Sequence, residues 1–222
     1  MKLEKQLKVM RDATMDRMPR SIIQVFKTSI DKIRKDQLKN RAFQIGDIVP
    51  NLPLTTIKKE SVLLSEFLQK EFLVLNFYRG GWCPYCNLEL REYERLKKDF
   101  DSAKASIIGI SAEIPDRTLQ TANKNTLTIP LLTDVNAKLM KEIGIMFRLD
   151  KASKQEYENF GMDFAQIHGN TNFELPVPAV YVINKKMEIV FIHFEEDYMK
   201  RLEPITLLNH LKNKTVLKQS EL

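Results

Sequence analysis

The chain has 222 residues, 43% of them hydrophobic and 29% charged, which are the proportions of an ordinary folded protein. No apolar run is long enough to cross a bilayer, and the first residues lack the apolar core of a secretory signal. The net charge of +6 comes from lysines spread among acidic residues, which argues against a nucleic-acid surface. We therefore expect a cytoplasmic protein with neither a membrane nor a nucleic acid as partner.

Residues 1–42 are expected to form an N-terminal helical arm, followed by a main domain over residues 43–222. Pro19 divides the arm into two helices, because proline is well tolerated at a helix start. The apolar stripes of the arm are Leu3, Leu7 and Met10, then Ile22, Ile23, Phe26, Ile30 and Ile33. They must pack on the main domain or on a second copy of the chain, which would make a homodimer.

Strands and helices then alternate, which predicts an α/β sheet with covered faces. The expected strands are 52–57, 72–78, 105–111, 129–134, 179–183 and 189–192, the last two as a hairpin. The expected helices are 62–68, the segment that follows the cysteines, 115–124, 135–143 and 203–212. Residues 144–175 show no clear period and are expected to form an insertion of short helices over the core.

Both cysteines of the chain, Cys83 and Cys86, directly follow a buried strand and a Gly80-Gly81 turn. They fall on the first turn of a helix, whose partial positive charge stabilises a thiolate. A thiolate is a nucleophile, and the second thiol is placed to attack the mixed disulfide or sulfenic acid that the first one forms. The spacing therefore predicts redox chemistry carried by Cys83 and Cys86.

Zinc binding and two inert buried thiols are the alternatives. Zinc would need two more ligands, and His168, His193 and His210 show no paired short spacing. Inert thiols would not explain the flanking Trp82 and Pro84. The chain has no Gly-rich phosphate loop, and thiol chemistry needs no metal, flavin or nicotinamide, so no cofactor is expected.

Beyond this motif, the chain resembles the thioredoxin fold, and more closely the peroxiredoxin-like branch of the alkyl hydroperoxide reductase/thiol-specific antioxidant family. The resemblance covers residues 43–212 and rests on Gly46-Asp47 with Pro50, Phe77–Cys86, Pro130–Asp134, Leu175–Ala179 and Asp197–Pro204. It implies a central mixed β-sheet flanked by helices, with an N-terminal helical arm like that of bacterial C-x-x-C members.

The candidate site departs from the peroxiredoxin pattern Pro-x-x-x-Thr-x-x-Cys. Aligned with that pattern, Cys86 takes the position of the peroxide-attacking cysteine, Cys83 that of the threonine and Arg79 that of the proline. Pro178 stands where these proteins carry an arginine, and Arg201 corresponds to a later family arginine. The chain therefore lacks the hydrogen bonds by which the family's threonine hydroxyl and arginine help to cleave the peroxide O–O bond. Each of them would supply about 2–4 kcal/mol of transition-state stabilisation.

Other features resemble thioredoxin, namely the Trp-Cys-x-x-Cys order and a proline directly before a strand. That proline is cis in thioredoxin, so the Val177-Pro178 bond is predicted to be cis, with an ordinary strand-edge proline as the alternative. Glu89 matches a frequent family glutamate or is a solvated helix carboxylate. Arg79 lowers a thiol pKa if it points inward and is otherwise a surface residue. Asn76 lies inside the central strand and needs a partner.

The resemblance implies a thiol-based antioxidant peroxidase in which Cys86 attacks a hydroperoxide, Cys83 resolves it, and a thioredoxin- or glutathione-type donor restores the thiols. The alternative is thiol–disulfide exchange on protein disulfides, with Cys83 attacking and Cys86 resolving. A third hypothesis is a redox sensor or adaptor that binds a partner through the arm with negligible turnover. The overall resemblance favours the peroxidase, and the local substitutions favour disulfide exchange.

Overall fold

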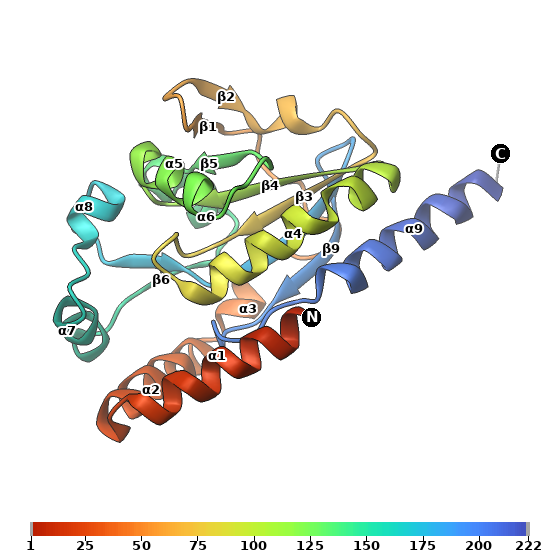
Figure 1. Cartoon of the computed structure of the whole chain (residues 1–222). Coiled ribbons are helices and arrows are strands. Elements are labelled where there is room, and N and C mark those ends of the chain that lie inside the picture. The colour runs from red at the N-terminus through yellow and green to blue at the C-terminus, as the bar shows by residue number, and fades with distance from the viewer. Residues whose placement is uncertain (1, 221–222) are drawn as a thin grey trace.

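The computed structural model describes residues 2–220, in which helices cover both faces of a central sheet (Figure 1). The strands are β1 (Pro53–Thr56), β2 (Ser61–Leu63), β3 (Phe72–Phe77), β4 (Ala105–Ser111), β5 (Leu131–Thr133), β6 (Met146–Arg148), β7 (Glu174–Pro176), β8 (Ala179–Asn184) and β9 (Ile189–Phe194). The α-helices are α1 (Leu3–Arg17), α2 (Arg20–Lys35), α3 (Leu38–Arg41), α4 (Pro84–Ser102), α5 (Pro115–Lys124), α6 (Lys138–Glu142), α7 (Lys151–Asn159), α8 (Phe164–His168) and α9 (Pro204–Ser220). Two 3₁₀ turns are η1 (Leu64–Phe67) and η2 (Val135–Ala137).

The central sheet has the strand order β2-β1-β5-β4-β3-β8-β9. β3 pairs parallel with β4 and antiparallel with β8, so the sheet is mixed. Every residue of β3 is buried, as expected for a central strand that is covered on both faces. The predicted α/β architecture is therefore confirmed.

Two apolar cores lie on opposite faces of this sheet. On one face α4 and α9 pack on the strands and α1 packs on α4, through residues such as Leu7, Tyr93 and Leu208. On the other face the core includes Ile33 at the end of α2 and Met140 of α6. Successive side chains of β3 and β4 point to opposite faces of the sheet, so each of these strands contributes to both apolar cores.

A third, smaller core joins α2 to the segment over residues 144–175. Phe26 of α2 packs there with Tyr157 of α7 and with Phe164 of α8, and Trp82 packs against the cluster. The predicted insertion of short helices is therefore present and covers one side of the Gly80-Gly81 turn.

Most predicted elements are confirmed, including the helix start at Pro204 and the antiparallel pairing of β8 with β9. Pro19 directly precedes α2. The predicted helix over 62–68 is partly wrong, since β2 and η1 share this segment, and the pairing of β6 with β7 was not predicted. Strands of three residues show too few alternations to be recognised in a sequence.

The predicted cis bond at Val177-Pro178 is wrong, because none of the described residues has a cis peptide bond. The backbone N–H of Val177 donates to the carbonyl of Ile145, and Pro178 connects β7 to β8. The backbone between β7 and β8 is extended, and a trans peptide bond fits that conformation.

Among the described residues, no helix is both long and apolar enough to cross a membrane.

The turn between β3 and α4 requires both of its glycines. Gly80 has a φ of +145°, and a Cβ there would lie 2.7 Å from a carboxylate oxygen of Glu113. A Cβ on Gly81 would lie 1.9 Å from the hydroxyl oxygen of Thr121 on α5. The turn is thus packed directly against the neighbouring helix.

We expect Gly81→Ala to lower the free energy of unfolding by about 1–3 kcal/mol, because the new methyl group overlaps the Thr121 side chain. Urea denaturation followed by circular dichroism measures this loss. Combining it with Thr121→Ala, which removes two of the three closest atoms, should recover part of the stability. An unchanged urea midpoint for Gly81→Ala would contradict the close packing.

Candidate redox site

Cys83 and Cys86 lie at the start of α4, immediately after the glycine turn. Cys83 is the residue that precedes the helix, Pro84 is its first residue, and Cys86 lies in its first turn. A proline at this position suits the helix because its missing N–H would have no partner there. Both cysteines are free thiols with side chains that are almost completely buried.

Arg79 lies inside the site, so the surface position considered from the sequence is wrong. Its guanidinium carbon lies 4.8 Å from the ring centre of Trp82 and 4.3 Å from that of Tyr198, and it donates a hydrogen bond to the Tyr157 hydroxyl. These contacts are cation–π interactions in a desolvated setting. Among the described residues no carboxylate forms an ion pair with Arg79, although only 2% of the residue is exposed.

Arg201 approaches the other thiol from the loop that precedes α9. Its Nη2 lies 3.3 Å from Cys86 Sγ, and its Nε donates to Glu89 at 2.8 Å. Both side chains of this ion pair are buried, so the solvated position considered for Glu89 is wrong. Two further hydrogen bonds, to the carbonyls of Tyr198 and Lys200, fix the guanidinium in place.

The two thiols are made unequal by their surroundings. Burial alone would raise the pKa of Cys83, but a hydrogen bond with the Cys86 thiol and the charges of Arg79 and Arg201 lower it to about 6. Burial and the adjacent Cys83 raise the pKa of Cys86 well above its usual value. These surroundings therefore favour the thiolate on Cys83, with the Cys86 thiol as its hydrogen-bond donor.

Two buried carboxyl groups border the dithiol. Burial raises the pKa of Glu89 to about 7 despite the neighbouring Arg201, and burial raises that of Glu113 to about 7 as well. Glu113 accepts a hydrogen bond from the Gly81 N–H at 3.0 Å. It also borders a cavity of about 310 Å³ that Gly81 and Trp82 line. Burial thus makes both carboxyl groups less acidic than exposed ones.

The structure brings together most of the residues that the sequence indicated. Trp82, Pro84 and Arg201 surround the two cysteines, and Pro178 lines the same small cavity as Arg79. Among the described residues, no group of three histidine, cysteine or acidic side chains is placed to hold a metal ion. Within the same residues the Asn76 amide has no hydrogen-bond partner.

Sequence reasoning missed Tyr157, Tyr198 and Glu113. One signal pointed to Glu113, which follows β4 by two residues. Since β4 runs parallel to β3, the two strands end at the same edge of the sheet, where the dithiol lies. No sequence signal placed Tyr157 on Arg79, because the two residues are 78 positions apart.

A dithiol at the start of the helix that follows a central strand, within a mixed sheet, defines a thiol protein of the thioredoxin-like fold. The sequence model of the AhpC/TSA family matches residues 45–192. The chain belongs to this family, as the resemblance implied.

Curated relatives include a putative peroxiredoxin bcp of Buchnera aphidicola, 31% identical over 100 residues. That match covers 45% of this chain and 63% of the relative, just under two thirds of its length. The thiol-disulfide oxidoreductase ResA of Halalkalibacterium halodurans is 24% identical over 167 residues, covering 72% of this chain and 77% of that protein. The chain is thus similar to proteins with two different names.

Solved structures agree on the fold. Peroxidoxin BcpB of Mycobacterium tuberculosis superposes with a TM-score of 0.62 at 21% identity, covering 77% of this chain and 97% of that one. PrxQ of Xylella fastidiosa gives 0.60 at 21% identity, covering 78% and 98%. The predicted thioredoxin-like fold is therefore confirmed.

We expect Arg79→Met to raise the pKa of Cys83, because the thiolate loses its cation. In the wild type, thiolate absorbance at 240 nm should disappear as the pH falls through about 6, since Cys83 becomes protonated there. The variant should lose it at higher pH. Arg79→Lys, which keeps a charge, is the matched control and should shift less. Identical titrations for all three proteins would contradict the assigned role of Arg79.

We expect Arg201→Met to lower the free energy of unfolding by about 3–5 kcal/mol, because it leaves the buried Glu89 without its cation. Adding Glu89→Gln to this variant should recover part of the loss. Urea denaturation provides the measurement. The exposed pair Lys8–Asp12 is the control, where Asp12→Asn should cost less than about 1 kcal/mol. Equal losses at the two pairs would contradict the importance of burial.

Proposed function

We propose that this chain is a thiol-based peroxidase that reduces hydroperoxides by cycling Cys83 and Cys86 between a dithiol and a disulfide. Membership of the AhpC/TSA family and similarity to proteins named peroxiredoxin support this reaction class. A thioredoxin- or glutathione-type thiol is the electron donor, and the cytoplasm is the location we favour, because a lone C-x-x-C pair suits a reducing compartment.

The chemistry needs only the two sulfur atoms and protons. A thiolate attacks the outer oxygen of the hydroperoxide, the O–O bond breaks, and the leaving alkoxide takes up a proton to depart as an alcohol. The sulfenic acid formed on the first cysteine then condenses with the second thiol, which releases water and forms the disulfide. Two thiols of the donor reduce that disulfide by exchange and become oxidised themselves.

The observation that carries the site assignment is the buried guanidinium of Arg79, which pairs with no carboxylate among the described residues and interacts with the Cys83 thiolate as its counter-charge. We assign the attack to Cys83 and the resolving step to Cys86. This assignment reverses the one that the peroxiredoxin pattern implies, in which Cys86 attacks. A low pKa favours Cys83 because the thiolate is the reactive form.

Thiol–disulfide exchange is the second candidate function, and the same activation of Cys83 favours it. In that reaction Cys83 attacks a protein disulfide and Cys86 releases the mixed disulfide. The similarity to a protein named ResA, which extends over more of this chain than the bcp match, supports this candidate.

The deciding experiment is stopped-flow oxidation of the reduced protein by hydrogen peroxide, followed by the fluorescence of Trp82, the only tryptophan. We expect rapid oxidation in the wild type and its loss in Cys83→Ser. The Cys86→Ser variant should oxidise rapidly but stop at a sulfenic acid, which dimedone traps. Circular dichroism checks that each variant is folded.

The other outcomes are equally informative. Loss of fast oxidation in Cys86→Ser alone would overturn the assignment of the attack to Cys83 while keeping the peroxidase. Slow oxidation of all proteins, with rapid Cys83-dependent reduction of a protein disulfide, would establish disulfide exchange instead. Fast oxidation without turnover in excess reductant would favour the redox sensor or adaptor.

A further inference from the structure

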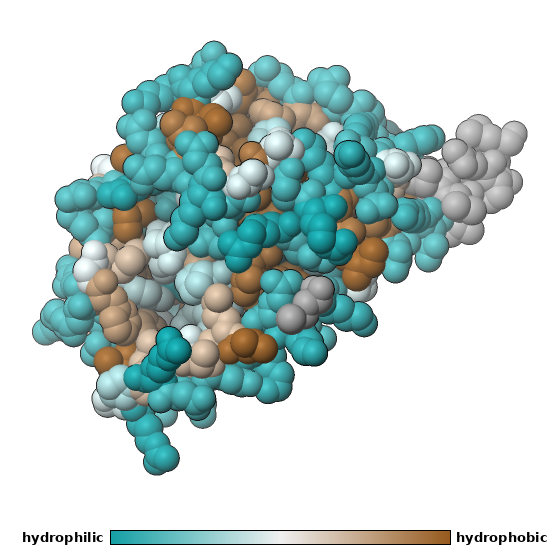
Figure 2. All heavy atoms as spheres, in the orientation of Figure 1, coloured by the Kyte–Doolittle hydropathy of each residue, from teal (hydrophilic) through white to brown (hydrophobic). Residues whose placement is uncertain are grey.

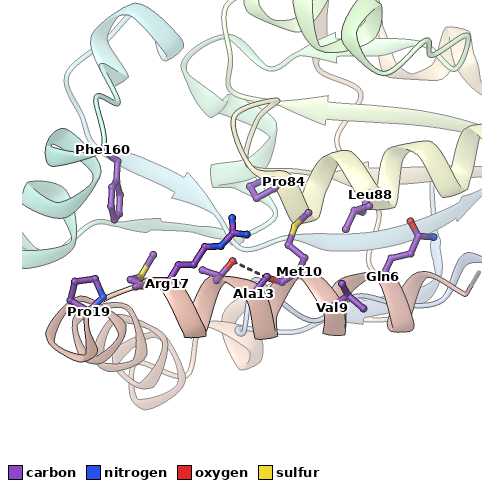
Figure 3. A pocket seen from close by; sticks show the side chains of 11 residues that line it. Gln6, Val9, Met10, Ala13, Arg17, Pro19, Pro84, Leu88 and Phe160 are labelled. Atoms are coloured by element: carbon purple, nitrogen blue, oxygen red, sulfur yellow. Dashed lines mark hydrogen bonds between the residues drawn. The ribbon is translucent and has the colours of Figure 1, made fainter.

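An apolar groove of about 790 Å³ lies between α1 and the first turns of α4. Figure 3 shows Val9, Met10 and Ala13 of α1 on one side, Pro84 and Leu88 of α4 on the other, and Phe160, just after α7, at one end. We call this space the arm groove. Its volume is within the range of small-molecule sites in proteins. Pro84 is bonded to Cys83, so the arm groove borders the redox site.

Most of the lining of the arm groove comes from the N-terminal arm, which precedes the family match. Eight of its eleven lining residues lie between Gln6 and Pro19, and the family match begins at residue 45. Figure 2 shows that the surrounding surface is largely hydrophilic. Nevertheless Val9 is 60% exposed and Phe160 is 49% exposed. Large apolar side chains that stay exposed around a recess are typical of a binding site.

Among the described residues that line the groove, Arg17 is the one cation. Its side chain extends from the last turn of α1 toward Pro84 (Figure 3). Among the described residues it forms no ion pair, whereas Lys8 on the same helix pairs with Asp12. A free guanidinium beside an apolar surface is complementary to a ligand with an anionic head and an apolar body.

The chemistry of the lining also favours a lipid-like chain over an extended polypeptide as the ligand. Its walls come mainly from two helices, whose backbone groups are hydrogen-bonded within each helix. Even the Thr14 hydroxyl donates to the Met10 carbonyl. A bound strand would leave its own N–H and C=O groups without partners, which is costly, while an acyl chain brings no such groups. Two methionines, Met10 and Met18, suit a flexible chain because their side chains adapt to it.

We propose that the arm groove binds a free single-chain anionic amphiphile of the fatty-acid type. The carboxylate pairs with Arg17, and the chain lies between α1 and α4. A bilayer is not the occupant, because the exposed face of α1 carries Glu4, Lys5, Lys8, Asp12 and Asp16. This site goes beyond the proposed function and does not depend on it.

The test is isothermal titration of the full chain with oleate below its micellar concentration, with oleyl alcohol as the uncharged probe. We expect saturable binding of one oleate. Val9→Asp should weaken it about tenfold or more, because a carboxylate enters the apolar wall. Arg17→Gln should weaken it about fivefold and remove the preference for oleate over the alcohol. Lys5→Gln on α1 and Leu119→Asp on α5 are matched controls outside the groove and should bind normally.

The proposal is overturned if oleate does not bind saturably, or if Val9→Asp and Arg17→Gln bind it as the wild type does. It is also overturned if only anionic vesicles, or only an apolar acidic peptide, bind at the arm groove. Oleate contains no peroxide and no disulfide, so this measurement and the stopped-flow experiment can each fail without affecting the other.

Discussion

The site depends on one electrostatic constraint, the burial of Arg79 without a carboxylate partner among the described residues. A buried guanidinium is costly unless an opposite charge or π-systems compensate it. The rings of Trp82 and Tyr198 and the hydroxyl of Tyr157 provide part of this compensation. The Cys83 thiolate provides the opposite charge, and Arg79 lowers the pKa of this thiol. We call the three rings around Arg79, those of Trp82, Tyr157 and Tyr198, the aromatic cage.

This constraint also explains why remote segments meet at the dithiol. Tyr157 comes from the insertion, which α2 holds through Phe26, and Tyr198 comes from the loop after β9. The same loop carries Arg201, which donates a hydrogen bond to the Tyr198 carbonyl. Tyr198 therefore contacts both arginines, Arg201 through its carbonyl and Arg79 through its ring. The arm, the insertion and the last loop are therefore parts of one support for the redox turn, although they are far apart in the sequence.

The sequence was sufficient for the long buried strands, the dithiol and the helix that carries it, because local pattern and spacing determine them. It was insufficient where long-range contacts decide the outcome. The local sequence around Arg79 was equally compatible with a surface residue. It is a buried cation because rings from distant parts of the chain, such as that of Tyr198, pack on it. The local sequence was also compatible with a solvated Glu89. In the structure Glu89 accepts a hydrogen bond from Arg201, which lies 112 positions away. The peptide bond before Pro178 followed the local strand connection, not the thioredoxin analogy.

The aromatic cage has a consequence for the balance between the oxidised and reduced forms. Formation of the disulfide removes the thiolate but leaves the charges of Arg79 and Arg201 buried beside it. The reduced form is thereby stabilised relative to the oxidised one, by the same interaction that lowers the pKa of Cys83. A couple whose reduced form is stabilised has a higher midpoint potential. The buried arginines that favour the thiolate thus also make the resulting disulfide a stronger electron acceptor than it would be without them.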